Sequence, residues 1–227
     1  MKILVAIPFL YGYGHSKNAI ESVMNQKDVD LLFIDNGGDP DIKTLAAEYL
    51  NHPNVKFIRN AQNIFVNPAW NQAMKLFLTS NYDLLCIMNS DLCLQQDWSE
   101  VVRKRLRANQ NECMVPKVVT DINVFNKSVD VTDSGFTEAN IGLPGIFFTL
   151  TKKQCQLVYP IPSELKIWFG DNWVFDRLRN SGHKTIIPEG FIAIHGNSQT
   201  VSKLPGISEL IEIDKLEWKK LCDSGQL

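Results

Sequence analysis

The apolar positions in the first half of the chain form short continuous runs separated by segments with helical spacing. The runs are Lys2–Pro8, Leu31–Asp35, Val55–Arg59 and Tyr82–Asn89. Runs without polar alternation are typical of strands buried on both faces, as in parallel sheets covered by helices. Strands that alternate with helical segments indicate βαβ units. The pattern therefore predicts a mostly parallel sheet with helices on its faces.

Three helices are expected between these strands. Ser16 has the side chain of a helix N-cap and precedes a helical pattern that runs to about Gln26. A turn over Asn36–Pro40 precedes a helix to about Leu50, and a third helix is expected after Pro68. The inner faces of the first and third helices are predicted to carry Ala19, Ile20, Val23 and Met24, and Ala69, Ala73, Met74 and Phe77.

The second half of the chain has a less regular pattern. Strands are predicted over Cys113–Val119, Gly145–Leu150, Lys184–Ile187 and Phe191–His195, and helices over Phe169–Ser181, with Gly182 at C′, and Ile207–Leu221. The polar segment Thr120–Asn140 is interpreted as a loop or a small hairpin. We expect one α/β domain over residues 1–227. The first half, about residues 1–95, would bind a nucleotide. The second half, about residues 96–227, would add a smaller mixed sheet and complete the site.

Composition narrows the class of protein. The chain has 227 residues, 44% of them hydrophobic and 21% charged, with a net charge of −2, which is ordinary for a soluble globular domain. No apolar run approaches the roughly 20 residues that span a bilayer, and the first run is too short for a signal peptide. Five scattered cysteines without metal-binding spacing favour reduced thiols and a cytoplasmic location. The basic cluster Arg103–Arg107 is interpreted as a solvated helix face rather than a polyanion contact.

Two predicted strands end on a carboxylate. Asp35 ends the second strand, and Asn89-Ser90-Asp91 ends the fourth. In open α/β sheets ligands bind at the carboxyl ends of the strands, so Asp91 is placed to hold a metal ion or a phosphate-bearing substrate. The alternatives are that Asp91 caps a following turn and that Asp35 caps the turn beginning at Asn36.

The order of the segments resembles a family-2-type glycosyltransferase with the GT-A fold, from Ile3 to about Thr200. The segments that carry the resemblance are Ile7-Pro8, Asn18–Gln26, Phe33–Gly38, Asn60–Asn71, Met88–Asp91, Phe169–Trp173, Arg177–Lys184, and His195 with Ser198. Met88–Asp91 stands where the family has its Asp-x-Asp motif. Asp91 keeps the second acidic position, whereas Asn89 replaces the first.

The resemblance implies a nucleotide-sugar donor, with UDP favoured, and a divalent metal, manganese or magnesium. Asp91 would hold the metal, and His195 would complete its shell or contact the diphosphate, a structural histidine being the alternative. The residues expected to bind the donor are Pro8, Tyr11, Asp35, Asn63, Asn71, Asn89, Ser90 and Asp91.

Asp171 is the residue expected to act as general base. In a one-step displacement the base takes a proton from the attacking acceptor hydroxyl, which implies inversion at the anomeric carbon. Asn172 and Trp173 are expected to bind the acceptor. The alternatives are a helix cap for Asp171 and core packing for Trp173. Gly142 and Gly145 flank Pro144 and would form either a close approach to the sugar or a simple turn.

The acceptor is expected to be a hydroxyl on a glycan or related surface polymer. Modified bases of viral DNA, which would place the protein in a host cytoplasm, are an alternative that the negative net charge disfavours. A non-catalytic nucleotide- or glycan-binding module is a second alternative, motivated by Asn89. A nucleotidyltransferase ranks lowest, because the loop after Pro8 lacks a basic phosphate-binding cluster.

Overall fold

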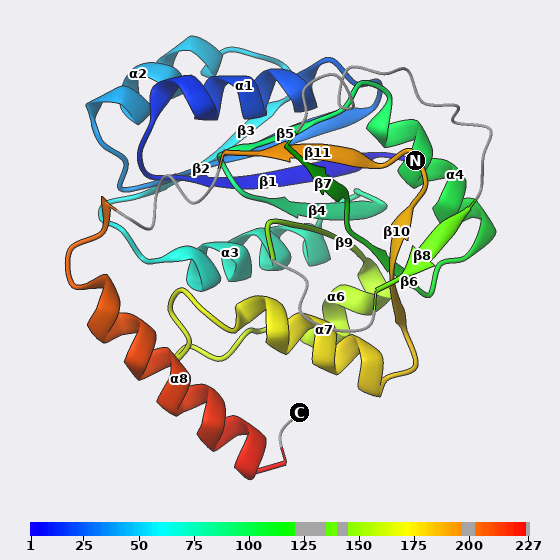
Figure 1. Cartoon of the computed structure of the whole chain (residues 1–227). Coiled ribbons are helices and arrows are strands. Elements are labelled where there is room, and N and C mark those ends of the chain that lie inside the picture. Colours follow the sequence, from blue (N-terminus) through cyan, green and yellow to red (C-terminus); the bar gives the residue numbers. More distant parts are fainter. Residues whose placement is uncertain (121–134, 140–144, 197–202, 226–227) are drawn as a thin grey trace.

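A computed structural model describes residues 1–120, 135–139, 145–196 and 203–225, and its centre is a five-stranded sheet (Figure 1). The strands are β1 (Ile3–Phe9), β2 (Val29–Asn36), β3 (Val55–Asn60), β4 (Leu84–Met88) and β9 (Phe147–Thr151). Their order is β3-β2-β1-β4-β9. The first four are parallel, and β9 is antiparallel to β4.

Helices cover both faces of this sheet, as Figure 1 shows. Helices α1 (Tyr13–Met24), α2 (Pro40–Tyr49) and α4 (Trp98–Ala108) contribute to one core, and α3 (Val66–Thr79), α6 (Lys152–Val158) and α7 (Gly170–Asn180) contribute to the other. Along β1, Val5 and Ile7 belong to the first core and Leu4 and Ala6 to the second. Successive side chains of a strand point to opposite faces, so a strand covered on both sides is apolar at every position.

Two three-stranded sheets lie beside the central one. In one, β10 (Lys184–Pro188) pairs with β6 (Glu112–Met114) and β8 (Phe136–Glu138). In the other, β11 (Ile192–His195) pairs with β5 (Leu92–Leu94) and β7 (Lys117–Val119). Each combines a parallel with an antiparallel pair. The expected α/β class, with a mostly parallel sheet and a smaller mixed region, is therefore confirmed.

Helix α8 (Ile207–Asp223) lies along the edge of the molecule, below α3 and beside α7 in Figure 1. Its inward contacts are made by Trp218 and Leu221, which pack against the second core, and by the fully buried Asp214. Ile213 and Leu216 are exposed on its outer side. No helix among the described residues is long and apolar enough to cross a membrane.

Several expected element boundaries are corrected by the structure. Helix α1 begins at Tyr13 with Gly12 at its N-cap, so Ser16 lies inside the helix, buried, rather than capping it. Helix α3 begins at Val66, and Pro68 occupies the first turn, where a missing N–H breaks no helical hydrogen bond. The strand expected over Cys113–Val119 is two strands, β6 and β7.

Other differences concern elements that the pattern did not resolve. Strand β5 and helix α6 were not predicted, because both are shorter than the windows over which periodicity is read. Most of the Thr120–Asn140 segment lies outside the described residues, and Phe136–Glu138 within it forms β8. Gly142, Pro144 and Ser198 also lie outside the described residues.

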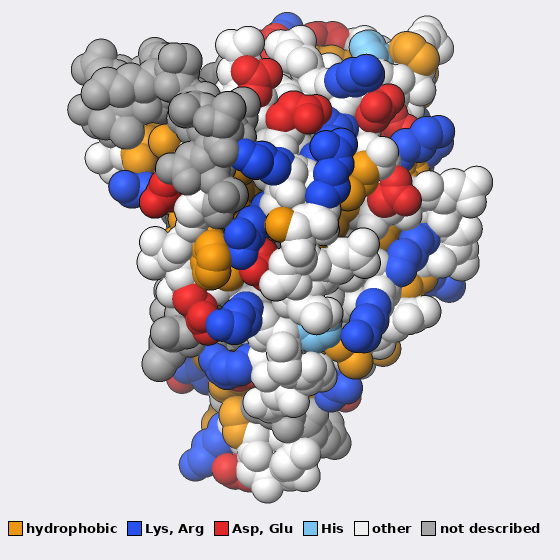
Figure 2. Space-filling view, turned by 90° about the vertical axis from the view of Figure 1, so that its right-hand side faces the viewer, with side chains coloured by type: hydrophobic (Ala, Val, Ile, Leu, Met, Phe, Trp, Pro, Cys, Tyr) orange, Lys and Arg blue, Asp and Glu red, His pale blue; other side chains and the backbone are white. Residues whose placement is uncertain are grey.

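The basic cluster Arg103–Arg107 is not a uniformly solvated face. The side chain of Arg103 is 5% exposed, forms an ion pair with Glu100 at 2.7 Å and donates to backbone carbonyls near the start of β2. Arg105 forms a two-pronged contact with the buried Glu112, at 2.6 and 2.5 Å. Both arginines thus join α4 to its neighbours, and the interpretation as a solvated face is wrong for them. Figure 2 shows acidic and basic side chains intermixed on one side of the molecule.

Candidate active site

A cavity of about 270 Å³ opens at the carboxyl ends of β1, β2 and β4, the edge where open α/β sheets bind ligands. Residues that were singled out in the sequence and that line it are Pro8, Asn63, Asn89, Ser90, Asp91, Gly145, Asp171 and His195. They come from segments that are far apart in the chain, so the fold assembles one site from both halves. Trp168, one of the aromatic residues near Asp171 that the sequence suggests could stack on a sugar, also lines the cavity. Further lining residues that were not expected at the site are Phe9, Leu10, Asn36, Phe65, Val66, Trp70, Ile146, Ile167 and Leu204.

Strand pairing brings Asp91 and His195 together. His195 ends β11 opposite Leu92 of β5, which places it beside Asp91, and its Nε2 lies 3.1 Å from Asp91 Oδ1. The N–H of Gly196 also donates to the carbonyl oxygen of Asp91 at 2.8 Å. A Cβ atom at position 196 would lie 3.2 Å from that oxygen, so glycine permits this close approach. Both side chains are mostly buried: that of Asp91 is 7% exposed and that of His195 is 15% exposed.

The separation of the two side-chain atoms fits a shared metal ion. Hard divalent cations in octahedral sites have ligands at about 2.1 Å, which places adjacent ligand atoms about 3.0 Å apart. The 3.1 Å between Asp91 Oδ1 and His195 Nε2 is a hydrogen-bond distance, and it is also compatible with that edge. Within the described part of the chain no group of three His, Cys, Asp or Glu side chains could hold a metal. A cation held by Asp91 and His195 would therefore need further ligands besides these two side chains.

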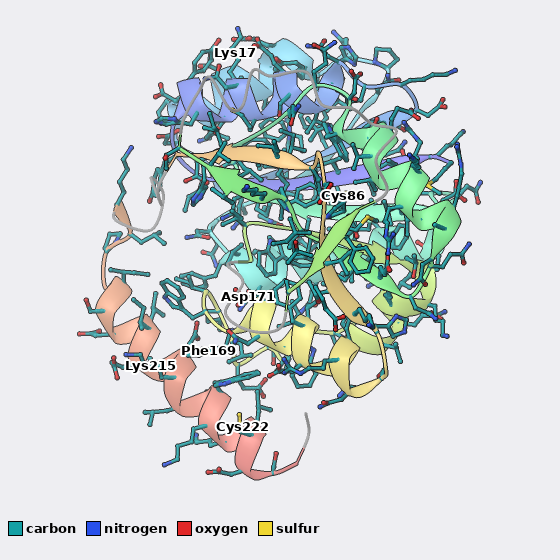
Figure 3. All side chains as sticks on the ribbon, turned by 45° about the vertical axis from the view of Figure 1, so that its right-hand side comes forward. Lys17, Cys86, Phe169, Asp171, Lys215 and Cys222 are labelled. Carbon is teal, nitrogen blue, oxygen red and sulfur yellow. The ribbon has the colours of Figure 1, made fainter. Side chains whose placement is uncertain are left out.

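Asp171 lies in the first turn of α7, facing the cavity (Figure 3). Its Oδ2 accepts a hydrogen bond from the N–H of Gly145 and its Oδ1 accepts one from the N–H of Asn172, both at 2.9 Å. Burial raises the pKa of Asp171, and these backbone N–H groups offset only part of the effect. A carboxylate with a raised pKa is a stronger proton acceptor, as a general base requires.

Gly145 approaches Asp171 so closely that a side chain would not fit between them. A Cβ atom at position 145 would lie 2.3 Å from Asp171 Cβ and 2.8 Å from Oδ2. The absence of a side chain therefore allows the N–H of Gly145 to reach the carboxylate. Gly145 thus makes a close approach to Asp171, whereas the approach to a sugar that the sequence suggested for Gly142 and Gly145 stays a prediction.

A network of neutral amides supports one wall of the cavity. Asn36 Nδ2 donates to Asn63 Oδ1 at 3.0 Å, and Asn60 Nδ2 donates to Asn36 Oδ1 at 3.1 Å. Asn63 Oδ1 also accepts from the N–H of Phe65 at 2.8 Å. Phe65 has a φ of 68°, a left-handed conformation in which the chain turns into α3. Paired side-chain amides thus hold the strained loop that forms this wall.

Five residues expected at the site do not line the cavity: Tyr11, Asp35, Asn71, Asn172 and Trp173. Asp35 Oδ1 accepts from the N–H of Gly38 at 2.8 Å, which is the turn-capping alternative. Asn71 exchanges two hydrogen bonds, each of 2.8 Å, with the backbone of Ile161. Trp173 is 7% exposed and donates from Nε1 to Val158 O at 2.8 Å. These contacts favour structural roles for Asp35, Asn71 and Trp173.

Comparisons with known proteins fit this geometry. A model of glycosyl transferase family 2 matches residues 7–162. That stretch includes Asp91 but ends before Asp171 and His195. A search of curated proteins returned no match.

Among solved structures, GalNAc-T7 with UDP, GalNAc and Mn²⁺ is similar with a TM-score of 0.69 and 14% identity, covering 98% of this chain and 50% of its own. S. aureus TarS 1-349 in complex with UDP has a TM-score of 0.65 and 13% identity, over 94% of this chain and 65% of its own. The mannosyltransferase PcManGT from Pyrobaculum calidifontis, with GDP-Man and Mn²⁺, has a TM-score of 0.66 and 11% identity, over 88% and 58%. The chain thus spans half to two thirds of these proteins and shares their fold.

Proposed function

Because the chain belongs to glycosyl transferase family 2 and has its GT-A fold, we propose that it transfers a sugar from a nucleotide-sugar donor to an acceptor hydroxyl. The observation that carries the proposal is the convergence of Asp171 with the Asp91–His195 pair on one cavity. This combination supplies a proton acceptor and a site for a cation, the two functions that displacement of a nucleoside diphosphate requires.

Asp91 and His195 are the residues that would hold a divalent cation, manganese or magnesium, and the similar proteins GalNAc-T7 and PcManGT contain Mn²⁺. When bound, the cation stabilises negative charge on the leaving diphosphate. To act as a ligand, the Nε2 of His195 would have to be the ring nitrogen without a proton. Asn89, at the end of β4, offers an amide that can hydrogen-bond a ribose hydroxyl but adds no negative charge.

Asp171 acts as the general base in this proposal. Its buried carboxylate, oriented by the N–H groups of Gly145 and Asn172, takes the proton of the acceptor hydroxyl as that oxygen attacks the anomeric carbon. Attack opposite the leaving diphosphate inverts the configuration at that carbon. Apolar lining residues such as Phe65, Ile146 and Ile167 limit water around the reacting atoms and so reduce donor hydrolysis.

UDP is the favoured donor nucleotide, because two of the similar structures, GalNAc-T7 and TarS, contain UDP. A glycan or related surface polymer is the favoured acceptor. A DNA acceptor is less favoured, because acidic and basic side chains are intermixed on the face in Figure 2 and Arg103 and Arg105 are engaged in internal ion pairs.

The test is a panel of UDP-, GDP- and TDP-sugars with and without manganese, read out by calorimetric binding and by release of the nucleoside diphosphate. We expect one donor to bind in a manganese-dependent manner and to be turned over. Asp171→Asn should abolish turnover while leaving donor binding within about threefold of wild type, because Asp171 acts on the acceptor. If no donor binds under any condition, the proposal is wrong.

One observation favours a second candidate, a non-catalytic nucleotide- or glycan-binding module. Asn89 replaces an acid, and Asp91 and His195 belong to no group of three His, Cys, Asp or Glu side chains that could hold a metal among the described residues. Such a module would bind a donor without turnover on any acceptor. Turnover that disappears in Asp171→Asn would exclude it.

A further inference from the structure

The segment of residues 166–168, immediately before α7, is held by buried polar groups on two sides. On one side, the fully buried carboxylate of Asp214 in α8 accepts hydrogen bonds from the backbone N–H groups of residues 166, 167 and 168, at 2.9, 2.7 and 2.8 Å. On the other side, Asn67 of α3 donates to the carbonyl oxygens of Lys166 and Trp168, both at 3.1 Å. The backbone of the segment is therefore fixed between two helices.

A ring contact adds a second attachment of α8 to this region. Phe169, which follows the segment, stacks on Trp218 of α8 with ring centroids 5.5 Å apart and planes 9° apart. Phe169 has a φ of 62°, and the chain turns there into α7, so its ring faces α8 while Asp171 faces the cavity (Figure 3). Helix α8 thus contacts the segment that leads directly to the proposed base.

Trp168 differs from its neighbours in its side chain. Its backbone is paired on both sides, yet its side chain is 43% exposed and lines the cavity. Leu204, just before α8, lines the same cavity. Because the backbone of Trp168 is fixed, its ring loses little conformational entropy when a ligand binds. The ring also offers a flat apolar surface with negative charge density above and below its plane. The C–H-rich face of a sugar ring fits such a surface.

We infer that Asp214 is a positioning residue, which holds Trp168 as a stacking platform for the sugar ring of the acceptor. The inference rests on the proposed function and assigns its acceptor to the carbohydrate class. The physical basis of the inference is the number of hydrogen-bond acceptors at position 214. Both oxygen atoms of a carboxylate accept hydrogen bonds, so Asp214 can pair with three N–H donors. In asparagine one oxygen is replaced by an NH₂ group, whose hydrogens would face the N–H groups of the segment. Asp214→Asn therefore loosens the segment without changing the size of the side chain.

The experiment measures steady-state transfer with the donor that binds in the panel and with methyl glycosides of glucose, galactose and N-acetylglucosamine as acceptors. The variants are Asp214→Asn, Trp168→Ala, Trp168→Phe and the double variant Asp214→Asn/Trp168→Ala. Lys215→Ala is the matched control, because Lys215 neighbours Asp214 in α8 and its side chain is exposed (Figure 3). Donor binding and melting temperature are measured for each variant.

We expect Asp214→Asn and Trp168→Ala each to raise the acceptor KM by about tenfold, with donor binding unchanged. Trp168→Phe should restore most of the loss. The double variant should have the acceptor KM of Trp168→Ala alone, since Asp214 acts through Trp168. Lys215→Ala should match wild type.

Three results would overturn the inference: additive effects in the double variant, an equal loss of donor binding in Asp214→Asn, or donor binding and hydrolysis by wild type with no glycoside used. Donor binding and hydrolysis without use of any glycoside would leave the proposed function standing. Failure to bind any donor would remove both the proposed function and this inference. If Asp214→Asn does not fold, the comparison of Trp168→Ala with Trp168→Phe still decides whether the platform exists.

Discussion

Gly145→Ala should disable transfer by displacing the proposed base rather than by unfolding the protein. The new Cβ would lie 2.3 Å from Asp171 Cβ, whereas carbon atoms in contact sit about 3.5 Å apart. Asp171 or the chain at position 145 must therefore move by about 1 Å, and the hydrogen bond between Gly145 N and Asp171 Oδ2 is lost. A misplacement of about 1 Å can cost on the order of a hundredfold in rate.

The assay is steady-state kinetics with the donor identified in the panel, together with chemical denaturation. We expect kcat to fall by roughly a hundredfold, which corresponds to about 2.7 kcal/mol, with donor binding unchanged. Overpacking should also lower the free energy of unfolding, by about 1–3 kcal/mol.

Gly14→Ala is the matched control for this substitution. Gly14 lies in α1 with no atom within 4 Å of an added Cβ, so alanine should leave kcat unchanged and stabilise the helix by roughly 0.5–1 kcal/mol. If Gly145→Ala keeps the wild-type kcat, the contact with Asp171 does not orient the base, and the reasoning fails.

Three further predictions concern Asp171, the metal pair and a buried ion pair. Because burial raises the pKa of Asp171, kcat should decline as the pH falls through that raised value, which a pH–rate profile would show. The same shift means that the ionised carboxylate opposes folding, so Asp171→Asn should raise the free energy of unfolding at neutral pH. The gain should vanish below about pH 4, where both folded and unfolded states are protonated, and equal stability of the two proteins at pH 7 would contradict it. A chelator should abolish transfer and manganese restore it, and His195→Ala should raise the manganese concentration for half-maximal activity by about 10-fold or more; an unchanged requirement would remove His195 from the metal shell. Arg105→Ala should lower the free energy of unfolding by about 3–5 kcal/mol in urea denaturation, because it removes the guanidinium that pairs with the Glu112 side chain, which is only 2% exposed, and a loss under 1 kcal/mol would show that water reaches Glu112.

The sequence predicted most of the sheet because its signal is local. Apolar runs mark β1 to β4, and the rule that ligands bind at their carboxyl ends led to Asp91. Asp171 was predicted from its motif context, and the structure places it at the same cavity as Asp91. In each case a short stretch of chain contained the necessary information.

The contacts missed by the sequence analysis depend on partners that are distant in the chain. Arg103 has the sequence pattern of a surface residue, yet it binds carbonyls 75 and 76 residues away. Asp214 lies in a helix rich in charged residues, and only the docking of α8 onto residues 166–168 shows that it is buried. Trp168 and Trp173 are similar in sequence context, but packing buries Trp173 and leaves Trp168 exposed. No periodicity distinguishes such pairs.

The pairing of β5 with β11 has a consequence for the chain as it is synthesised. Asp91 and His195 are 104 residues apart, so at about 5–20 residues per second roughly 5 to 20 seconds separate their emergence from the ribosome. Strands β1 to β4 can be made and begin to pair during that interval, while the chain still lacks half of its proposed cation site. A nascent chain would therefore acquire the ability to bind a cation there only after His195 has emerged, well after strands β1 to β4 have been made.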